Sequence, residues 1–553
     1  MNDRLRIVIV GGVAGGASAA ARARRCNADA EITVLEKGPA ASFANCGLPY
    51  HLGGEIEDRA KLIVASTELF WDRFRVRVRT GHEVTRIDRE AKTVTGQAVG
   101  SDEEFKLPYD KLILATGSTP VQPSFMQSDV ENVFQLWTLN DMDAILDFMK
   151  IRPVKKATVV GAGFVGLEVV EQLVRREVSV TLVERGDQIL KPLDYEMAKI
   201  VEKQLHKAKV ECRLGASVQE LLTTNQKCSA VKLEDESIAT ELVIVGAGVR
   251  PRTELAVESG LGVGETGGVL VNEFCQTEDP DVYAVGDMCE YHHRVLNKRT
   301  RVPLAGPANK AGRVAGAHAA RGDRETMPMV QGTAVVRVFE QTAASTGLNE
   351  RQCRDAGIDH RAATIQATHH AGYFPGARGL TLKVVYGLDG KILGAQGVGP
   401  EGVDKRIDAI ATAMHFGGTV YDLADLDLAY APPFGSAKDP VHMAAFVAQN
   451  DLQSEPELLA FDADIRGWQI VDVRSSRELE KLPAEPDAIH IPVDELHDRI
   501  EDLDPTRETV TICHSGKRAH VAACLLKGKG FRRVANLNGG MSIRRLRSNQ
   551  PSD

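Results

Sequence analysis

Two cysteines stand in sequence contexts that suit sulfur chemistry, and the first is Cys46. It lies in the stretch 42–50 (SFANCGLPY), and the positions five residues to either side hold Ala41 and His51. Cys46 therefore lacks the partner of a CxxxxC redox pair, and its oxidised state must be a sulfenic acid or a mixed disulfide with an external thiol. The glycine and proline that follow indicate a turn at a helix start, which would favour the thiolate. The alternative is a buried structural cysteine.

The second is Cys513, the first residue of a six-residue loop between an apolar strand and a predicted helix. The loop reads Cys513-His514-Ser515-Gly516-Lys517-Arg518. Such a loop can point successive backbone amides at one sulfur, and Lys517, Arg518 and the helix N-terminus would stabilise a thiolate or persulfide anion. The cysteines at 26, 212, 228, 275, 289, 353 and 524 and the histidine pairs at 292–293 and 369–370 lack metal-ligand spacing, so no metal is predicted.

Two glycine-rich segments carry the pattern of dinucleotide binding. Each lies between an apolar strand and a helix, and each is followed by a strand that ends in an acid, Glu36 or Glu184. Backbone N–H groups there meet a pyrophosphate, and the acid accepts hydrogen bonds from a ribose. The first segment departs from GxGxxG because Val13 takes the middle glycine position. The predicted binding residues are Gly11, Gly12, Val13, Ala14, Gly15, Gly16, Glu36 and Lys37 in the first and Gly161, Gly163, Phe164, Val165, Gly166, Glu184, Arg185 and Gly248 in the second.

Length and composition limit the class of protein. At 553 residues the chain has room for several domains of about 150 residues each. A formal net charge of -9 disfavours nucleic-acid binding. The cysteines are scattered, no apolar run is long enough to span a bilayer, and the N-terminus resembles a buried strand rather than a signal peptide. We therefore expect a cytoplasmic protein that binds neither nucleic acid nor membrane.

Hydrophobic periodicity predicts the elements that position these residues. Strands are expected at 7–10, 32–35, 158–160 and 179–183, so that two βαβ units enclose the glycine-rich segments. Strands near 334–339 and 380–386 and helices near 403–414 and 437–447 indicate an α+β domain. The chain turns polar at 448–456, which indicates a linker. A final segment has strands at 469–473 and 509–513 and a helix at 518–526.

The segment 277–287 (TEDPDVYAVGD) resembles the second FAD fingerprint of flavoproteins with two dinucleotide-binding domains. The stretch 115–118 ends a strand, and 303–312 resembles the segment that those enzymes place against the flavin. The resemblance implies FAD in the first βαβ unit, with Asp287 on the ribityl chain, and NAD(P)H in the second unit, inserted between the FAD halves. It adds Ala115, Thr116, Gly117, Gly286, Asp287, Pro303, Leu304 and Ala305 to the FAD site.

The acid of the second unit bears on which nicotinamide cofactor binds. Glu184 would bond a free ribose 2′-hydroxyl and repel a 2′-phosphate, which favours NADH. Arg185 beside it could partly accommodate the phosphate, so NADPH stays open.

The stretch SFANCGLPYHLGG resembles the coenzyme A disulfide reductase family, and the likeness covers about residues 5–445. The family uses one cysteine with coenzyme A as the other thiol, in a homodimer whose partner subunit contributes two tyrosines. The matching positions are Tyr373 and Tyr430, whose phenols could protonate a departing thiolate. Either could instead be a surface aromatic.

The same resemblance implies a coenzyme A site that holds its phosphates with cations. The matching residues are Ser18, Arg22, Arg25, Ser42, Asn45 and Lys438. Arg22 and Arg25 could instead complement the dipole of their helix, which is the role we expect for Arg24. A lysine that contacts coenzyme A in the family has no clean counterpart near 73–75.

Residues 460–545 resemble a rhodanese domain. The loop from Cys513 to Arg518 matches its active loop, and 471–474, 488–492 and 537–541 match other segments of it. The usual Gly-His-Ile-Pro-Gly stretch is replaced at 484–487. Because Cys513 is present, the domain is expected to be active rather than purely regulatory.

These patterns predict an α/β protein with two Rossmann-like dinucleotide-binding domains, an α+β dimerisation domain and a C-terminal α/β rhodanese domain. The expected limits are 1–150 and 249–326 for the two parts of the FAD domain and 151–248 for the NAD(P)H domain. The interface domain is expected at 327–447, a linker at 448–458 and the rhodanese domain at 459–553.

The function hypothesis follows from the resemblances. Electrons pass from NAD(P)H through FAD to Cys46, which attacks coenzyme A persulfide, polysulfide or coenzyme A disulfide and forms a mixed disulfide with coenzyme A. Cys513 collects or relays sulfane sulfur. One alternative is an NADH oxidase or peroxidase that cycles Cys46 through a sulfenic acid. Another is a redox sensor or sulfur carrier that acts on a protein partner.

Overall fold

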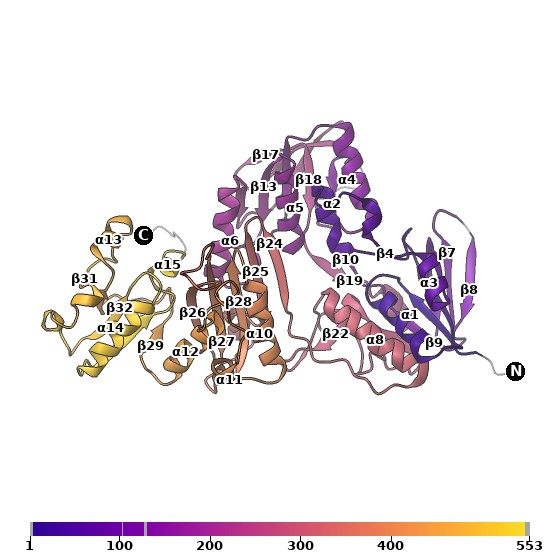
Figure 1. Cartoon of the computed structure of the whole chain (residues 1–553). Coiled ribbons are helices and arrows are strands. Elements are labelled where there is room, and N and C mark those ends of the chain that lie inside the picture. The colour runs from indigo at the N-terminus through magenta and orange to yellow at the C-terminus, as the bar shows by residue number, and fades with distance from the viewer. Residues whose placement is uncertain (1–3, 102, 127–129, 548–553) are drawn as a thin grey trace. The chain divides into compact units, whose positions relative to one another are not determined.

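The computed structural model of the chain describes residues 4–101, 103–126 and 130–547 (Figure 1). They fall into two compact units: one runs to Asp187 and resumes at Lys209–Gly332, and the other joins Gln188–Ala208 to the chain from Thr333 onward. Among the helices described, none combines the length and the apolar character needed to cross a membrane.

The first unit contains a parallel five-stranded sheet in the order β21-β9-β1-β2-β5. Its strands are β1 (Arg6–Val10), β2 (Glu31–Glu36), β5 (Val76–Thr80), β9 (Lys111–Leu114) and β21 (Val282–Ala284). β1 is buried from Ile7 to Val10, as expected of a parallel strand that is covered on both faces. Because β21 pairs with β9, the chain returns after the second βαβ unit to complete the first sheet.

Helices α1 (Gly15–Cys26) and α8 (Ala305–Arg321) lie side by side in this unit (Figure 1). A Cβ on Gly312 of α8 would overlap the backbone of Gly15 in α1, so the two helices require glycine at their crossing. This contact joins the first glycine-rich segment to a helix almost 300 residues later in the chain.

A second parallel sheet of the same unit has the order β11-β18-β12-β13-β14. Its strands are β11 (Val133–Phe134), β12 (Lys156–Val160), β13 (Ser179–Glu184), β14 (Glu211–Leu214) and β18 (Leu242–Val245), and α5 (Phe164–Arg175) follows its glycine-rich turn. A Cβ on Gly166 would overlap the Gly161 carbonyl oxygen, just as one on Gly16 would overlap that of Gly11. The two glycine-rich turns therefore have the same tight backbone.

The second unit contains an antiparallel sheet in the order β24-β25-β28-β27-β26. The strands are β24 (Ala334–Val338), β25 (Gln341–Gly347), β26 (Arg361–Thr368), β27 (Gly379–Tyr386) and β28 (Ile392–Gly399). Helices α10 (Val403–His415) and α12 (Pro440–Leu452) pack on this sheet. The arrangement is the α+β domain predicted from the sequence.

The C-terminal part of this unit has a parallel sheet in the order β29-β33-β32-β30-β31. Its strands are β29 (Glu457–Leu459), β30 (Gln469–Asp472), β31 (Ile489–His490), β32 (Glu508–Ile512) and β33 (Arg533–Leu537), with helices α13 (Ser476–Lys481), α14 (Lys517–Gly528) and α15 (Gly540–Arg544). Asn538 ties this sheet to β26, since its amide donates to the Ala362 carbonyl (2.9 Å) and accepts from the Thr364 N–H (2.8 Å).

This architecture confirms the predicted fold class. One local expectation differs: α12 continues to Leu452, several residues into the segment expected to be a linker. The helix continues because Ala448 and Asp451 are buried and Asp451 accepts a hydrogen bond from the Tyr386 hydroxyl (2.7 Å). The domain limits given above remain predictions.

Candidate functional site

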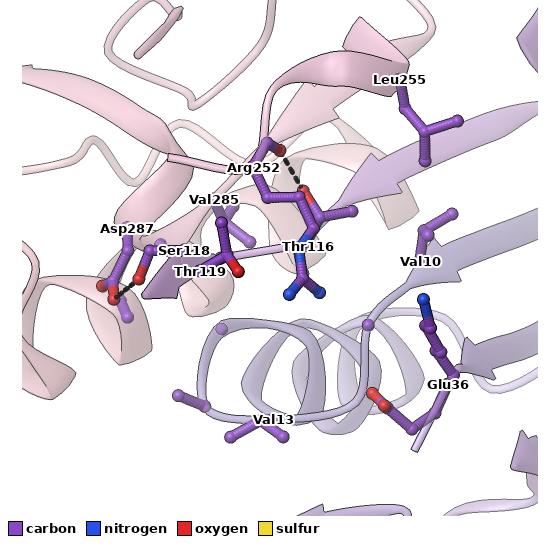
Figure 2. A pocket seen from close by; sticks show the side chains of 18 of the residues that line it. Val10, Val13, Glu36, Thr116, Ser118, Thr119, Arg252, Leu255, Val285 and Asp287 are labelled. Carbon is purple, nitrogen blue, oxygen red and sulfur yellow. Dashed lines mark hydrogen bonds between the residues drawn. The ribbon is translucent and has the colours of Figure 1, made fainter. Parts of the chain in front are cut away.

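The first glycine-rich segment borders a cavity of about 490 Å³ at the carboxyl ends of β1 and β9 (Figure 2). The Glu36 carboxylate accepts hydrogen bonds from the N–H groups of Gly12 (2.7 Å) and Gly38 (2.6 Å), so it braces the loop beside it. Of the residues predicted for FAD, those that line the cavity are Gly11, Val13, Ala14, Gly15, Glu36, Lys37, Ala115, Thr116, Gly117, Gly286 and Asp287. Gly12, Gly16, Pro303, Leu304 and Ala305 do not line it.

The loop after β9 closes this cavity from the other side. Gly11 has φ +103°, and a Cβ there would overlap the Ala115 carbonyl oxygen, so glycine is needed for the two loops to meet. Asp287 accepts a hydrogen bond from the Ser118 hydroxyl (3.0 Å), and burial raises its pKa. Figure 2 shows the Arg252 side chain extending into the cavity, which supplies a cation for an anionic ligand.

A second cavity, of about 540 Å³, shares Val13, Ala14, Phe43 and Asn45 with the first as lining residues. Cys46 lines it, together with five of the six residues predicted for coenzyme A: Ser18, Arg22, Arg25, Ser42 and Asn45. The sixth, Lys438, lies in the other unit, next to the N-cap of α12. The structure therefore brings most of the predicted thiol-substrate residues into one cavity beside the first.

The cations of this cavity differ in how they are held. Arg22 lies 3.3 Å from Glu325 and 3.6 Å from Asp323, and its buried Nε has no hydrogen-bond partner among the described residues. The Arg25 guanidinium stands 5.6 Å from the centre of the Phe74 ring. Arg24 is not in the cavity lining.

Arg24 lies in the last turn of α1 and bonds backbone carbonyls near the end of that helix. Its guanidinium donates to four backbone carbonyls, among them that of Phe74 (2.7 Å), and so fastens the end of α1 to neighbouring segments.

Cys46 sits in a short 3-10 turn (Asn45–Gly47) that leads into α2 (Leu48–Gly53). It is exposed, yet the surrounding protein and the carboxylates of Glu168 and Asp287 raise the pKa of its thiol. The expectation that a helix N-terminus would favour the thiolate was therefore wrong. A backbone hydrogen bond at Cys46 lowers the pKa, but desolvation and the two carboxylates outweigh it.

The second glycine-rich segment repeats the geometry of the first. The Glu184 carboxylate accepts from the N–H groups of Ala162 (2.8 Å) and Gly186 (2.8 Å), as Glu36 does in the first unit. Phe164 and Val165 begin α5, and Arg185 is exposed. On the same helix Glu168 accepts a hydrogen bond from the Tyr50 hydroxyl (2.9 Å), which links α5 to the segment that follows Cys46.

The two predicted tyrosines meet in the second unit. The hydroxyl groups of Tyr373 and Tyr430 are 3.1 Å apart, both side chains are exposed, and this hydrogen bond raises the pKa of Tyr373. Arg406 holds their segments together, since it donates to the His369 carbonyl (2.6 Å) and to Asp439 (2.7 Å). The two tyrosine side chains thus lie next to each other, exposed to solvent, on segments that Arg406 holds together.

The loop that begins at Cys513 lies between β32 and α14. Cys513 is 1% exposed, and its sulfur accepts hydrogen bonds from the N–H groups of Gly516 (3.2 Å) and Ala519 (3.4 Å). A Cβ on Gly540 would approach the Cys513 and His514 carbonyls to 2.7 Å, so the start of α15 packs directly on the loop. The amides point at one sulfur, as the sequence predicted.

Comparison with known proteins agrees with this geometry. The family model described as pyridine nucleotide-disulphide oxidoreductase matches residues 5–321, that family's dimerisation domain matches 333–440, and a rhodanese-like domain matches 456–542. The chain belongs to the pyridine nucleotide-disulphide oxidoreductase family. It is an oxidoreductase, as predicted, and its family supports the predicted FAD and NAD(P)H.

Individual relatives cover most of the chain. A coenzyme A disulfide reductase of Staphylococcus aureus (strain JH9) is 36% identical over 445 residues, which are 80% of this chain and 100% of that protein. The crystal structure of reduced CoADR-RHD from Bacillus anthracis has a TM-score of 0.95 and 39% identity and covers 98% of each chain. An NAD-dependent persulfide reductase from A. fulgidus has a TM-score of 0.91 and 36% identity and covers 98% of this chain and 100% of its own.

Several residues that line the two cavities were not among the predicted site residues. Ser118 directly follows the predicted Thr116 and Gly117, and that adjacency could have found it. Asn309 of α8, which lines the second cavity, falls within the stretch 303–312 that the sequence had singled out. Arg252, which lines the first cavity, and Arg313, which lines the second, had no such signal. They reach the cavities only because distant segments pack against α1 and the sheet.

Proposed function

We propose that this chain is an NAD(P)H-dependent flavoprotein that reduces coenzyme A persulfide, polysulfide and coenzyme A disulfide through Cys46, while Cys513 handles sulfane sulfur. The observation that carries the proposal is the second cavity, which is lined by Cys46 together with Ser18, Arg22 and Arg25. A thiol with an anionic, phosphate-bearing tail suits such a cavity, because its sulfur can reach Cys46 while its phosphates reach guanidinium groups.

The first cavity fits FAD. The tight turn at Gly11 frees backbone N–H groups for a pyrophosphate, Glu36 stands where a ribose would be bound, and the buried Asp287 offers an acceptor deeper in the cavity. FAD held in this cavity would supply two-electron chemistry, with hydride accepted from NAD(P)H and an electron pair passed on to sulfur. Asn45 lines both cavities. Cys46, the next residue, therefore lies close to the cavity that would hold the flavin, from which the electrons would come.

Cys46 performs the covalent step. Its thiolate attacks the inner sulfur of coenzyme A persulfide, the S–S bond of the persulfide breaks, HS⁻ leaves, and a Cys46–S–S–coenzyme A mixed disulfide forms. Two electrons and protons then return Cys46 and coenzyme A to thiols. Since the pKa of Cys46 is raised, its proton must be removed before attack.

Tyr373 and Tyr430 would act as proton donors to the departing sulfur. Their hydroxyls are exposed and paired at 3.1 Å, and the family's dimerisation domain covers the segments that carry them. In a homodimer they would lie beside Cys46 of the partner subunit, with Lys438 near the same coenzyme A. The nine free cysteines suit a reducing, cytoplasmic setting.

NADH is the expected nicotinamide cofactor. Glu184 is fixed by two backbone N–H groups, so its carboxylate stays in place to accept from a free 2′-hydroxyl and to repel a 2′-phosphate. Arg185, which is exposed, leaves some use of NADPH.

Anaerobic NADH oxidation tests the proposal with coenzyme A persulfide, inorganic polysulfide and coenzyme A disulfide as separate substrates. Cys46→Ser should lose nearly all turnover with each, whereas Cys524→Ser, which removes another exposed cysteine, should retain it. Mass spectrometry of the wild-type protein should show a Cys46–coenzyme A adduct that NADH removes. Equal turnover by Cys46→Ser and the wild type would refute the proposal, and turnover of oxygen or peroxide alone would favour an oxidase.

A further inference from the structure

The two cations of the Cys513 loop, Lys517 and Arg518, differ in whether they form an ion pair within the protein. Arg518 makes a bidentate ion pair with Glu478 of α13, with N–O distances of 2.7 and 2.5 Å. Lys517 is exposed and makes no ion pair within the part of the chain that the structure describes. The buried arginines of this domain, Arg474 and Arg544, are also paired, with Asp472 and Glu485. Lys517 is therefore the loop cation without an ion pair among the described residues, whereas Arg518 interacts with both Glu478 and Cys513.

Glu478 cannot easily move away from Arg518. The same carboxylate oxygen that accepts from Arg518 also accepts from the Ser475 N–H (3.0 Å) and hydroxyl (2.9 Å), which forms the capping box of α13. These donors hold the pKa of Glu478 at about 2, so it remains a carboxylate at neutral pH. The negative charge beside Arg518 is thus permanent and fixed in position.

Two backbone amides, one from Gly516 in the loop and one from Ala519 in α14, are directed at the sulfur of Cys513. There they would stabilise a thiolate or the terminal sulfur of a persulfide. An oxyanion donor such as thiosulfate brings two negative charges and releases sulfite, a dianion, so it needs several free cations or amides. A persulfide, R–S–SH, releases a thiolate that carries one charge and can take up a proton.

We infer that Glu478 makes the Cys513 site selective for thiol persulfides over thiosulfate by neutralising Arg518. The inference rests on the proposed sulfur-handling role of Cys513 and names its donor. The Cys513 thiolate attacks the outer sulfur of R–S–SH, the S–S bond of the donor breaks, RS⁻ leaves, and Cys513–S–SH forms. The sulfane sulfur passes from one thiol to the other, so no external oxidant or reductant takes part.

The test uses the full chain without NADH, which separates it from the reductase assay. Sulfur transfer to cyanide is measured as thiocyanate with thiosulfate or glutathione persulfide as donor. Glu478→Gln frees Arg518 and keeps a capping side chain, since glutamine also serves in a capping box. Glu480→Gln removes the same charge from an exposed position of the same helix and is the matched control.

The wild type should favour the persulfide over thiosulfate by about 100-fold or more in kcat/KM. Glu478→Gln should raise kcat/KM for thiosulfate roughly tenfold, mainly through KM, because one charge-assisted contact becomes available. Its persulfide activity and both activities of Glu480→Gln should stay within about threefold of the wild type. Comparable wild-type use of both donors would overturn the inference, as would a thiosulfate gain that Glu480→Gln matches.

Intact-mass measurement of the wild type provides a check that depends on no variant. A single exposure to equal concentrations of each donor should load a sulfur atom on Cys513 from the persulfide far faster than from thiosulfate. Equal loading rates would overturn the inference even if Glu478→Gln failed to fold, and the proposed NADH-dependent reduction through Cys46 would be untouched.

Discussion

Arg406 is the buried side chain that joins the segments carrying Tyr373 and Tyr430. It is 1% exposed, and its guanidinium donates to both carboxylate oxygens of Asp439 (3.2 and 2.7 Å) and to the Gly402 and His369 carbonyls (3.0 and 2.6 Å). Arg406→Met removes every one of these donors and leaves Asp439, only 3% exposed, as a buried charge without its cation. Breaking such a pair costs about 3–5 kcal/mol. That is a large share of the roughly 5–15 kcal/mol that stabilises a folded domain.

The assay compares urea denaturation of Arg406→Met with that of Arg351→Met. Arg351 is exposed in the same domain and donates one hydrogen bond, to the Lys191 carbonyl (3.0 Å), so its loss should cost less than about 1 kcal/mol. Hydrogen exchange in α10 and α12 assigns the lost stability to this domain. The double variant Arg406→Met/Asp439→Asn should recover much of the loss, because the neutral amide still caps α12 and no charge is left unpaired.

Two results would refute the reasoning. Coincident unfolding curves for Arg406→Met and Arg351→Met would show that the buried pair contributes no more than a surface arginine. A double variant no more stable than Arg406→Met would show that the orphaned charge on Asp439 is not the source of the loss. If the reasoning holds, the single variant should also reduce turnover, because the tyrosine segments lose their common anchor.

Three further predictions follow from local geometry. Glu168→Gln removes a negative charge that raises the pKa of Cys46, so iodoacetamide should alkylate Cys46 faster at neutral pH, which peptide mass spectrometry measures; an unchanged rate would contradict this. Gly16→Ala places a Cβ against a neighbouring backbone carbonyl and should lower the flavin-to-protein absorbance ratio of the purified protein, whereas Gly528→Ala, whose Cβ meets open space, should not. Burial lowers the pKa of His293 to about 4 in the folded protein, so His293 binds a proton more readily in the unfolded protein. The free energy of unfolding should therefore fall by about 3 kcal/mol as the pH drops from roughly 6.5 to 4. Over this pH range the melting temperature of His293→Asn should fall less than that of the wild type. An equal fall in the two proteins would contradict the prediction.

The sequence alone predicted the elements whose signals are local. An apolar strand, a glycine-rich turn and a helix follow one another within about 20 residues in both βαβ units, and the overlap that a Cβ on Gly16 or Gly166 would create explains why the spacing is recognisable. The loop at Cys513 is equally local, since strand, loop and helix are consecutive. Two small antiparallel sheets, at His82–Pro108 and Glu220–Ala239, were not predicted, because short exposed strands carry little periodicity.

Tertiary structure decided the rest. That Cys46 shares a cavity with Arg22 and Arg25 depends on α1, the Cys46 segment and α8 packing together, and no spacing in the chain records that distance. The pKa of Cys46 is raised, opposite to expectation, because other segments bury it and because Glu168 and Asp287 approach it from segments more than 100 residues away. The neutralisation of Arg518 by Glu478 is a contact of the same kind. The local sequence determines which residues can form a tight turn or cap a helix, because these depend on the backbone of a few neighbouring residues. The burial and the electrostatic surroundings of a site depend on every segment that packs there, so only the tertiary structure determines them.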